Sequence, residues 1–215
     1  MGYKYMCTKD TIRCIKIHDE TPIPLCCKEH LFELLDFITH TLDANKIPYW
    51  LDYGTLLGAT RDNKHIPWDD DCDISIFIKD EDKVGELLAA NEYGYILYNN
   101  PTVHNVKSFM AIGYSEINRL HVDIFAWKKD GNLMKRHNYL DNGPISPDAK
   151  KGKHFPYEFV KTLSKIKLDG KEYLAPNNPV EFCKMRYGKA WNTPMTVAAW
   201  NTTIDNNTNK IYSFD

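Results

Sequence analysis

Hydrophobic residues along the chain recur at two different spacings, one helical and one strand-like. After Pro22 and Pro24, apolar side chains return every three or four residues from Leu31 to Leu42, which predicts an amphipathic helix that ends near Asn45. The other elements that the pattern predicts are a strand at 47–51, a short helix start at 56–59, a helix at 81–90, and strands at 74–78, 106–114 and 121–127.

A further helix is marked by its capping residues. Asn178 is a suitable N-cap, Pro179 fits the first turn, and Glu181 stands at the capping-box position. Gly188 is expected to end this helix, and from Asn201 onward the Asn- and Thr-rich chain is expected to be loosely held. The pattern as a whole predicts a mixed α/β (α+β) fold, with helices packed on a mixed sheet.

The most informative segment is the acidic run at 66–73, which leads directly into the strand at 74–78. If the strand geometry extends back through the run, Asp69, Asp71 and Asp73 share one side of the strand. Carboxylates so close together repel one another unless a cation neutralises them, and Mg²⁺ or Mn²⁺ suits such ligands. A solvated acidic loop is the alternative, but flanking Trp and Ile residues argue against it.

Composition limits the classes of function. The chain has 215 residues, enough for one domain with at most a small added module, and its net charge of −2 gives no sign of nucleic-acid or anionic-membrane binding. It has no apolar run of about 18 residues that would span a membrane. Residues 1–7 lack the apolar core of a signal peptide. We therefore expect a cytoplasmic protein.

Four of the six cysteines cluster near the start of the chain, at Cys7, Cys14, Cys26 and Cys27. In a reducing compartment such a cluster favours zinc over disulfides. The spacing is irregular and contains no Cys-x-x-Cys pair, so four ordinary thiols are the alternative interpretation.

Two further segments extend the acidic run into a candidate site. Gly54 and Thr55 end a predicted strand, where glycine allows a phosphate to approach the backbone and threonine adds a hydroxyl and an amide at a helix start. Asp123 lies between two apolar residues of a later strand, as a site carboxylate does. An ordinary aspartate at a strand end is the alternative for Asp123.

These blocks resemble the nucleotidyltransferase fold of the polymerase beta type and, more closely, the LicD/fukutin-related phosphotransferase family. The resemblance covers about residues 22–194, in the order found in the family. It is carried by 49–61 (YWLDYGTLLGATR), 66–74 (IPWDDDCDI), 120–125 (LHVDIF), 175–179 (APNNP) and 186–188 (RYG), with Trp191 soon after.

The resemblance implies transfer of a phospho-alcohol, such as phosphocholine or ribitol phosphate, from a CDP-activated donor to a glycan hydroxyl. It implies Asp71, Asp73 and Asp123 as Mg²⁺ or Mn²⁺ ligands, and Asp69 as a ligand or the general base. Asp123 is the other candidate for the general base. In the fukutin-related branch a cysteine pair before the first helix binds zinc with two upstream cysteines, which corresponds here to Cys26 and Cys27 with Cys7 and Cys14.

The implied organisation is an N-terminal segment at 1–27 with a zinc site, a catalytic domain at 28–195 and a tail at 196–215. Gly54 and Thr55 would hold a phosphate of the donor. Arg61 could pair with a second phosphate oxygen, its alternative being a surface cation. His121 would orient Asp123 or a phosphate, unless it is a plain strand histidine.

Two other functions stay open at this point. The same site could transfer the nucleotide part of its substrate to a small molecule or protein, since the metal chemistry is shared. The chain could also be a non-catalytic binder of a nucleotide or glycan, although mutually repelling aspartates argue against that. The sequence does not indicate which alcohol or acceptor is used, or the oligomeric state.

Overall fold

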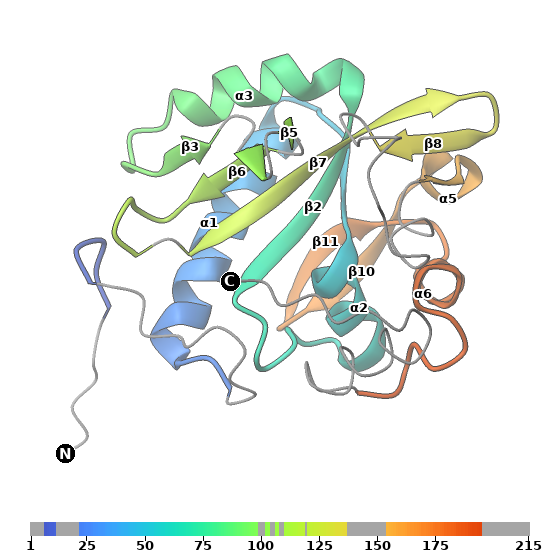
Figure 1. Ribbon diagram of the computed structural model, residues 1–215, viewed down its shortest axis with the longest axis horizontal. Coiled ribbons are helices and arrows are strands. Elements are labelled where there is room, and N and C mark those ends of the chain that lie inside the picture. Colours follow the sequence, from blue (N-terminus) through green and yellow to red (C-terminus); the bar gives the residue numbers. More distant parts are fainter. Residues whose placement is uncertain are drawn as a thin grey trace.

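A mixed sheet forms the centre of the molecule (Figure 1). The computed structural model describes residues 7–11, 22–98, 102–103, 106–107, 110–118, 120–136 and 154–194. Within them the sheet has the strand order β1-β2-β7-β6-β3, with β8 beside β7 and β9 beside β8. Its strands are β1 (Tyr49–Leu51), β2 (Asp71–Phe77), β3 (Ile96–Tyr98), β6 (Met110–Gly113), β7 (His121–Asp130), β8 (Leu133–Arg136) and β9 (His154–Pro156).

The strands β2 and β7 are parallel, and the other neighbours in this sheet are antiparallel. The expectation of a mixed sheet flanked by helices is therefore confirmed. The parallel pair is buried in the middle of the sheet. Its register fixes the relative positions of side chains that lie about 50 residues apart in the sequence.

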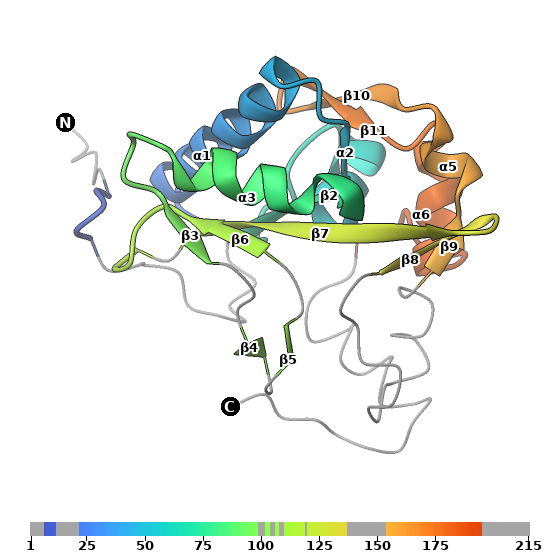
Figure 2. The same ribbon diagram turned by 90° about the horizontal axis from the view of Figure 1, so that it is seen from above.

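Helices α1 (Leu25–Ala44) and α3 (Glu81–Ala89) lie on the same side of the sheet (Figure 2). Leu31, Leu35, Ile38 and Leu42 of α1 are fully buried, which explains the predicted helical spacing. A 3₁₀ turn at Ile78–Asp80 joins β2 to α3. None of the helices in the described part of the chain is long and apolar enough to cross a bilayer.

Helix α2 (Tyr53–Asp62) starts immediately after β1. The side chain of Asp52 accepts a hydrogen bond from the backbone N–H of Tyr53 and caps the helix. The prediction that the strand ends at Gly54 and Thr55 is therefore wrong: both residues lie in the first turn of α2. The helix ends at Asn63, which adopts a left-handed conformation with φ of 54°.

The C-terminal half of the described chain adds a hairpin and two helices. The hairpin joins β10 (Ser164–Leu168) to β11 (Lys171–Ala175), and the helices are α5 (Glu158–Lys161) and α6 (Pro179–Tyr187). Helix α6 confirms the capping prediction, because the Asn178 side chain accepts from the N–H of Glu181 and Gly188 ends the helix with φ of 79°.

The single strand predicted at 106–114 is wrong. The structure has two strands there, and they pair differently: β5 (Val106–Lys107) joins β4 (Thr102–Val103) in a small hairpin, whereas β6 belongs to the main sheet. The predicted boundary between residues 27 and 28 falls inside α1. The tail predicted at 196–215 lies outside the described residues.

Candidate functional site

The register of β2 and β7 brings the predicted carboxylates together. Asp71 pairs with His121, and Asp73 pairs with Asp123. Because paired residues of neighbouring strands share a face, and alternate residues along one strand also do, all four side chains lie on the same face of the sheet. One potential ligand atom each from Asp71, His121 and Asp123 lies within 4.8 Å of the others, as a metal site requires.

Asp69 precedes β2, which begins at Asp71, so the strand does not extend back to it. It nevertheless reaches the same place, because ligand atoms of Asp69, Asp70 and Asp71 also lie within 4.8 Å of one another. A Cβ placed on Gly54 would lie 2.5 Å from Asp69 Oδ2. Glycine at position 54 therefore lets the Asp69 carboxylate approach the first turn of α2.

Burial and mutual repulsion make these carboxylates hard to ionise without a cation. Burial and the charge of Asp71 raise the pKa of both Asp69 and Asp73 well above the usual range. Burial raises the pKa of Asp123 to about 7, against the opposing effect of His121. Among the residues that the structure describes, Asp123 Oδ1 is buried without a hydrogen-bond partner, and His121 Nε2 lies 3.5 Å away.

This set of donors suits a hard divalent ion. Carboxylate oxygens are preferred ligands of Mg²⁺ and Mn²⁺. An ion here would favour the ionised carboxylates and offset the repulsion among them.

The first turn of α2 holds Asp73 in place. The N–H of Gly54 donates to Asp73 Oδ2 at 3.1 Å, and the backbone N–H of Asp73 donates to Thr55 Oγ1 at 2.8 Å. Thr55 is 1% exposed, so its hydroxyl serves the packing of α2 on β2. The predicted phosphate contact of Gly54 and Thr55 stays a prediction, and the visible role of both residues is to position a carboxylate.

A buried polar network lies next to the acidic side chains, and the sequence interpretation missed it. Asp52 is 0% exposed and pairs with Arg186, whose Nη2 lies 2.9 Å from Asp52 Oδ1. Ser75 Oγ donates to Asp52 Oδ2 at 2.7 Å, and Trp127 Nε1 donates to Ser75 Oγ at 2.9 Å. The sequence allows Asp52 to be recognised as a helix N-cap. Its partner Arg186 stands 134 residues away, so no local pattern predicts their pairing.

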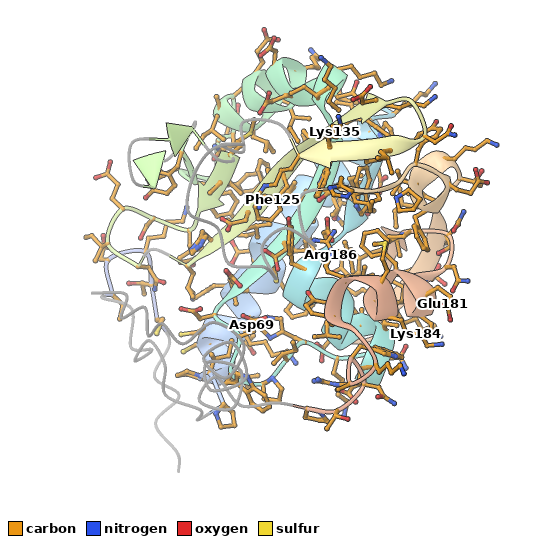
Figure 3. All side chains as sticks on the ribbon, turned by 45° about the vertical axis from the view of Figure 1, so that its right-hand side comes forward. Asp69, Phe125, Lys135, Glu181, Lys184 and Arg186 are labelled. Atoms are coloured by element: carbon orange, nitrogen blue, oxygen red, sulfur yellow. The ribbon has the colours of Figure 1, made fainter. Side chains whose placement is uncertain are left out.

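Figure 3 shows how α6 takes part in this arrangement. Arg186 points inward, toward the region of Asp69 and Phe125, whereas Glu181 and Lys184 lie on the outer side of the helix. The guanidinium carbon of Arg186 lies 4.2 Å from the ring centroid of Tyr53, the first residue of α2. Helix α6 thus fixes the start of α2 through a buried charge pair and a stacked ring.

The structure does not place Arg61 beside the carboxylates. Arg61 lies in the last turn of α2, about 10 Å along the helix axis from Gly54. Its Nε lies 2.6 Å from Asp62 Oδ2. Another arginine, Arg136 at the end of β8, is close to the site: its Nη1 donates to the Tyr53 hydroxyl at 3.2 Å. No sequence motif distinguishes Arg136.

The cysteine cluster forms a second candidate metal centre. Sulfur atoms of Cys7, Cys26 and Cys27 lie within 4.8 Å of one another, whereas Cys14 lies outside the described residues. The sulfur atoms of Cys26 and Cys7 are 3.2 Å apart. Burial opposes ionisation of Cys26, but hydrogen bonds from Cys7 and Cys27 outweigh it and lower its pKa. Three converging thiols fit a zinc ion.

The loop at residues 7–11 reaches this position through Lys9. The Lys9 ammonium lies 4.3 Å from the ring centroid of Tyr95 and 5.4 Å from that of Tyr114, and it donates to the carbonyl of Tyr93. Ser115 Oγ donates to the Lys9 carbonyl at 2.5 Å. Cys7 is therefore held beside α1 by contacts to the residues that follow β6 and to the segment before β3.

Comparison with known proteins identifies the family to which this chain is similar. Residues 46–178 match the family described as LicD/FKTN/FKRP, nucleotidyltransferase domain. The chain is 30% identical over 194 residues to "Ribitol 5-phosphate transferase FKRP" of Homo sapiens, with 85% of this chain and 38% of the relative covered. It is 29% identical over 191 residues to "Ribitol-5-phosphate transferase FKTN" of Mus musculus, with 88% and 39% covered.

Among solved structures, the lincosamide antibiotic adenylyltransferase LnuA with bound lincomycin aligns with a TM-score of 0.47 and 18% identity, covering 86% of this chain and 98% of that one. The chain spans about two fifths of the length of FKRP and FKTN. The family match extends over more than half of the chain and includes both acidic strands. The chain therefore belongs to the LicD/FKTN/FKRP family and contains its nucleotidyltransferase domain.

Proposed function

We propose that the protein is a metal-dependent transferase that moves a phospho-alcohol from a CDP-activated donor to a glycan hydroxyl. The observation that carries this proposal is the convergence of Asp71, Asp73 and Asp123 on one face of the central parallel strands. The names of the relatives support the transferred group, because FKRP and FKTN are ribitol 5-phosphate transferases.

In this proposal Asp71, Asp73 and Asp123 hold one or two Mg²⁺ or Mn²⁺ ions, with His121 beside them. A bound ion would supply a positive charge that orients the donor diphosphate and stabilises the leaving group. The acceptor oxygen attacks the phosphorus atom that carries the alcohol, the bond from that phosphorus to the oxygen of CMP breaks, and CMP leaves.

The proton of the acceptor hydroxyl needs a base, and we assign that role to Asp69. Its carboxylate lies beside Asp71 but before the strand, at the edge of the group. It must be ionised to accept the proton, and a neighbouring cation would favour that form. Gly54 keeps space for this carboxylate against α2.

We further propose that Cys7, Cys26 and Cys27 bind a structural zinc ion, with Cys14 as the predicted fourth ligand. The support is the convergence of the three thiols and the lowered pKa of Cys26. Zinc at this position would tie the N-terminal loop to the start of α1 and would have no part in the transfer itself.

The test uses the purified chain with CDP-ribitol or CDP-choline, Mn²⁺ and a glycan acceptor. Mass spectrometry should show the acceptor heavier by a phospho-alcohol, with release of CMP. An acceptor heavier by a nucleotide would instead support nucleotidyl transfer, the alternative that the description of the matching domain favours.

Asp71→Asn should abolish this transfer without loss of the fold, because it removes a proposed ligand and keeps the shape of the side chain. Asp130→Asn is the matched control, since Asp130 is exposed at the far end of β7. Full activity of Asp71→Asn with Mn²⁺ present would refute the metal assignment.

A further inference from the structure

The proposed donor and the proposed site carry charge of the same sign. A nucleoside diphosphate ester is an anion, and it would approach a group of five aspartates formed by Asp69, Asp70, Asp71, Asp73 and Asp123. One or two divalent ions compensate only part of this charge and contact only some of the phosphate oxygens. The remaining oxygens call for a cation from the protein, and a guanidinium suits them because it donates hydrogen bonds in a planar fork.

Two arginines lie near the start of α2, and they differ in what they contact. Arg186 is buried, pairs with Asp52, and lies against the rings of Tyr53 and Phe182 at 4.2 and 4.9 Å. Its charge is therefore already compensated inside the protein. Arg186 acts as a positioning residue for Asp52 and the helix that Asp52 caps.

Arg136 has a different position. It pairs with Trp127 in the register of β7 and β8, so its side chain starts on the face that carries Trp127, Phe125 and Asp123. Its guanidinium carbon lies 4.3 Å from the ring centroid of Phe125, two residues along the strand from Asp123. The side chain therefore extends along β7 toward the carboxylates.

The other contact of Arg136 fixes its guanidinium beside α2. Its Nη1 donates to the Tyr53 hydroxyl at 3.2 Å, and Tyr53 immediately precedes Gly54, whose N–H holds Asp73. Tyr53 also packs edge-on against Phe125, with 4.7 Å between ring centroids. Arg136 thus lies between the start of α2 and β7, at the rim of the acidic group, and it is only partly buried.

We propose that Arg136 is the phosphate-binding cation of the site and contacts oxygens of the donor diphosphate that the metal leaves uncovered. The inference rests on the proposed function, since it assumes a diphosphate donor. It replaces Arg61 in that role, because Arg61 lies at the other end of α2. The stacking on Phe125 and the hydroxyl of Tyr53 hold the guanidinium in place before the donor arrives.

Isothermal titration of the full chain tests this proposal with Mn²⁺ alone and then with CDP at saturating Mn²⁺. Arg136→Ala should weaken CDP binding by about 10- to 100-fold, as expected for the loss of hydrogen bonds to a charged group. Its affinity for Mn²⁺ should stay the same or rise, because a nearby positive charge has been removed. Arg136→Lys should recover part of the CDP affinity, because the lysine ammonium keeps the positive charge but lacks the planar hydrogen-bond donors of the guanidinium.

Lys135→Ala is the matched control, because Lys135 is the neighbouring cation on β8, projects to the opposite face and pairs with Asp130 at 2.5 Å. It should bind CDP like the wild type. Wild-type affinity for CDP in Arg136→Ala would overturn the inference while leaving the proposed function intact. Parallel loss of Mn²⁺ and CDP binding would also overturn it, because Arg136 would then support the carboxylates. Failure of the wild type to bind CDP with Mn²⁺ would overturn both.

Discussion

The two candidate metal centres of this protein are built in opposite ways. The carboxylates stand on adjacent strands whose hydrogen-bonded register sets their spacing, in the middle of the sheet. The cysteines come from one turn of α1 and from a separate loop, so their spacing depends on how that loop docks. One centre has its geometry before any metal binds, whereas the other depends on a tertiary contact.

The electrostatics of the two centres differ as well. Burial and mutual repulsion raise the pKa of Asp73 and Asp123, so the ionised cluster is unstable without a cation. Protonated thiols carry no charge and pack as small apolar groups, so they do not repel one another in this way. We therefore expect the acidic centre to use its metal for chemistry and the cysteine centre to use its metal for stability, and the following variants test that division.

The largest expected effect is on transfer activity in Asp73→Asn. The loss should exceed the roughly 100-fold typical of a residue that only supports a metal ligand. The melting temperature should stay the same or rise, because one repelling charge is gone while the side-chain oxygen can still accept from the N–H of Gly54. Cys26→Ser should show the opposite result: its melting temperature should fall, and it should keep its transfer activity at temperatures below that melting temperature. A common loss of stability in both variants would contradict the division.

The next effect is on stability when zinc is removed. A chelator should lower the melting temperature of the wild type, because metal binding to thiolates contributes directly to folding free energy. Chelation should have little further effect on Cys7→Ser, in which the proposed site is already incomplete. Calorimetry with and without the chelator makes the comparison. If elemental analysis shows that the protein carries zinc and the chelator leaves its melting temperature unchanged, a structural role for that zinc is contradicted.

The third effect is on the pH dependence of Mn²⁺ binding. Asp123 must lose a proton to become a ligand, and its pKa is about 7. Mn²⁺ affinity should therefore rise by about tenfold per pH unit below that value and level off above it. Titration in two buffers of different ionisation enthalpy should show proton release on binding at pH 6. Asp123→Asn should remove this part of the proton release, and a release equal to that of the wild type would exclude Asp123 as its source.

The same pKa has a consequence for the metal-free protein. Its folded-state value lies above that of an unfolded aspartate, so the unfolded chain releases this proton first as the pH rises. The contribution of Asp123 to stability is full below about pH 4 and is lost progressively up to about pH 7. Saturating Mn²⁺ should reduce this loss, because the ion favours the ionised carboxylate.

The contrast between the two centres also explains which features could be predicted from the sequence: those that depend on local patterns, and not those that depend on tertiary packing. Asp71 and Asp73 stand in one strand pattern, and the period of two predicts the face that they share. That Asp123 shares this face follows from the register of β2 and β7 in the structure. The α1 and α6 helices were likewise predictable, because periodicity and capping residues are local signals. The pairing of Asp52 with Arg186 depends on packing between α2 and α6, which no local pattern encodes.

Two other parts of the structure were missed for different physical reasons. The hairpin of β10 and β11 turns at Asp169-Gly170, a readable turn signal, but Lys165 and Lys167 make β10 poorly apolar. The docking of Cys7 depends on Lys9 lying against Tyr95, far away in the sequence. Whether the predicted fourth ligand Cys14 joins the cluster stays a prediction, because Cys14 lies outside the described residues.

The smallest expected effect concerns this docking contact. Lys9→Ala removes a cation–π contact with Tyr95 and a hydrogen bond to the carbonyl of Tyr93, which should cost about 0.5–2 kcal/mol of loop docking. Cys7 would then be less firmly held beside Cys26, so a chelator should remove zinc faster, by up to roughly tenfold. Stopped-flow chelation with a zinc-sensitive dye measures that rate.

Two controls separate charge from bulk in this last experiment. Lys9→Met keeps the length of the side chain and loses the ammonium, so it should resemble Lys9→Ala if the charge on the aromatic rings holds the loop. Lys83→Ala changes an exposed lysine of α3 and should release zinc like the wild type. If Lys9→Ala also releases zinc at the wild-type rate, the cysteine centre does not depend on the docking of its loop. The two metal centres would then both be preformed, and the contrast between them would be one of ligand chemistry alone.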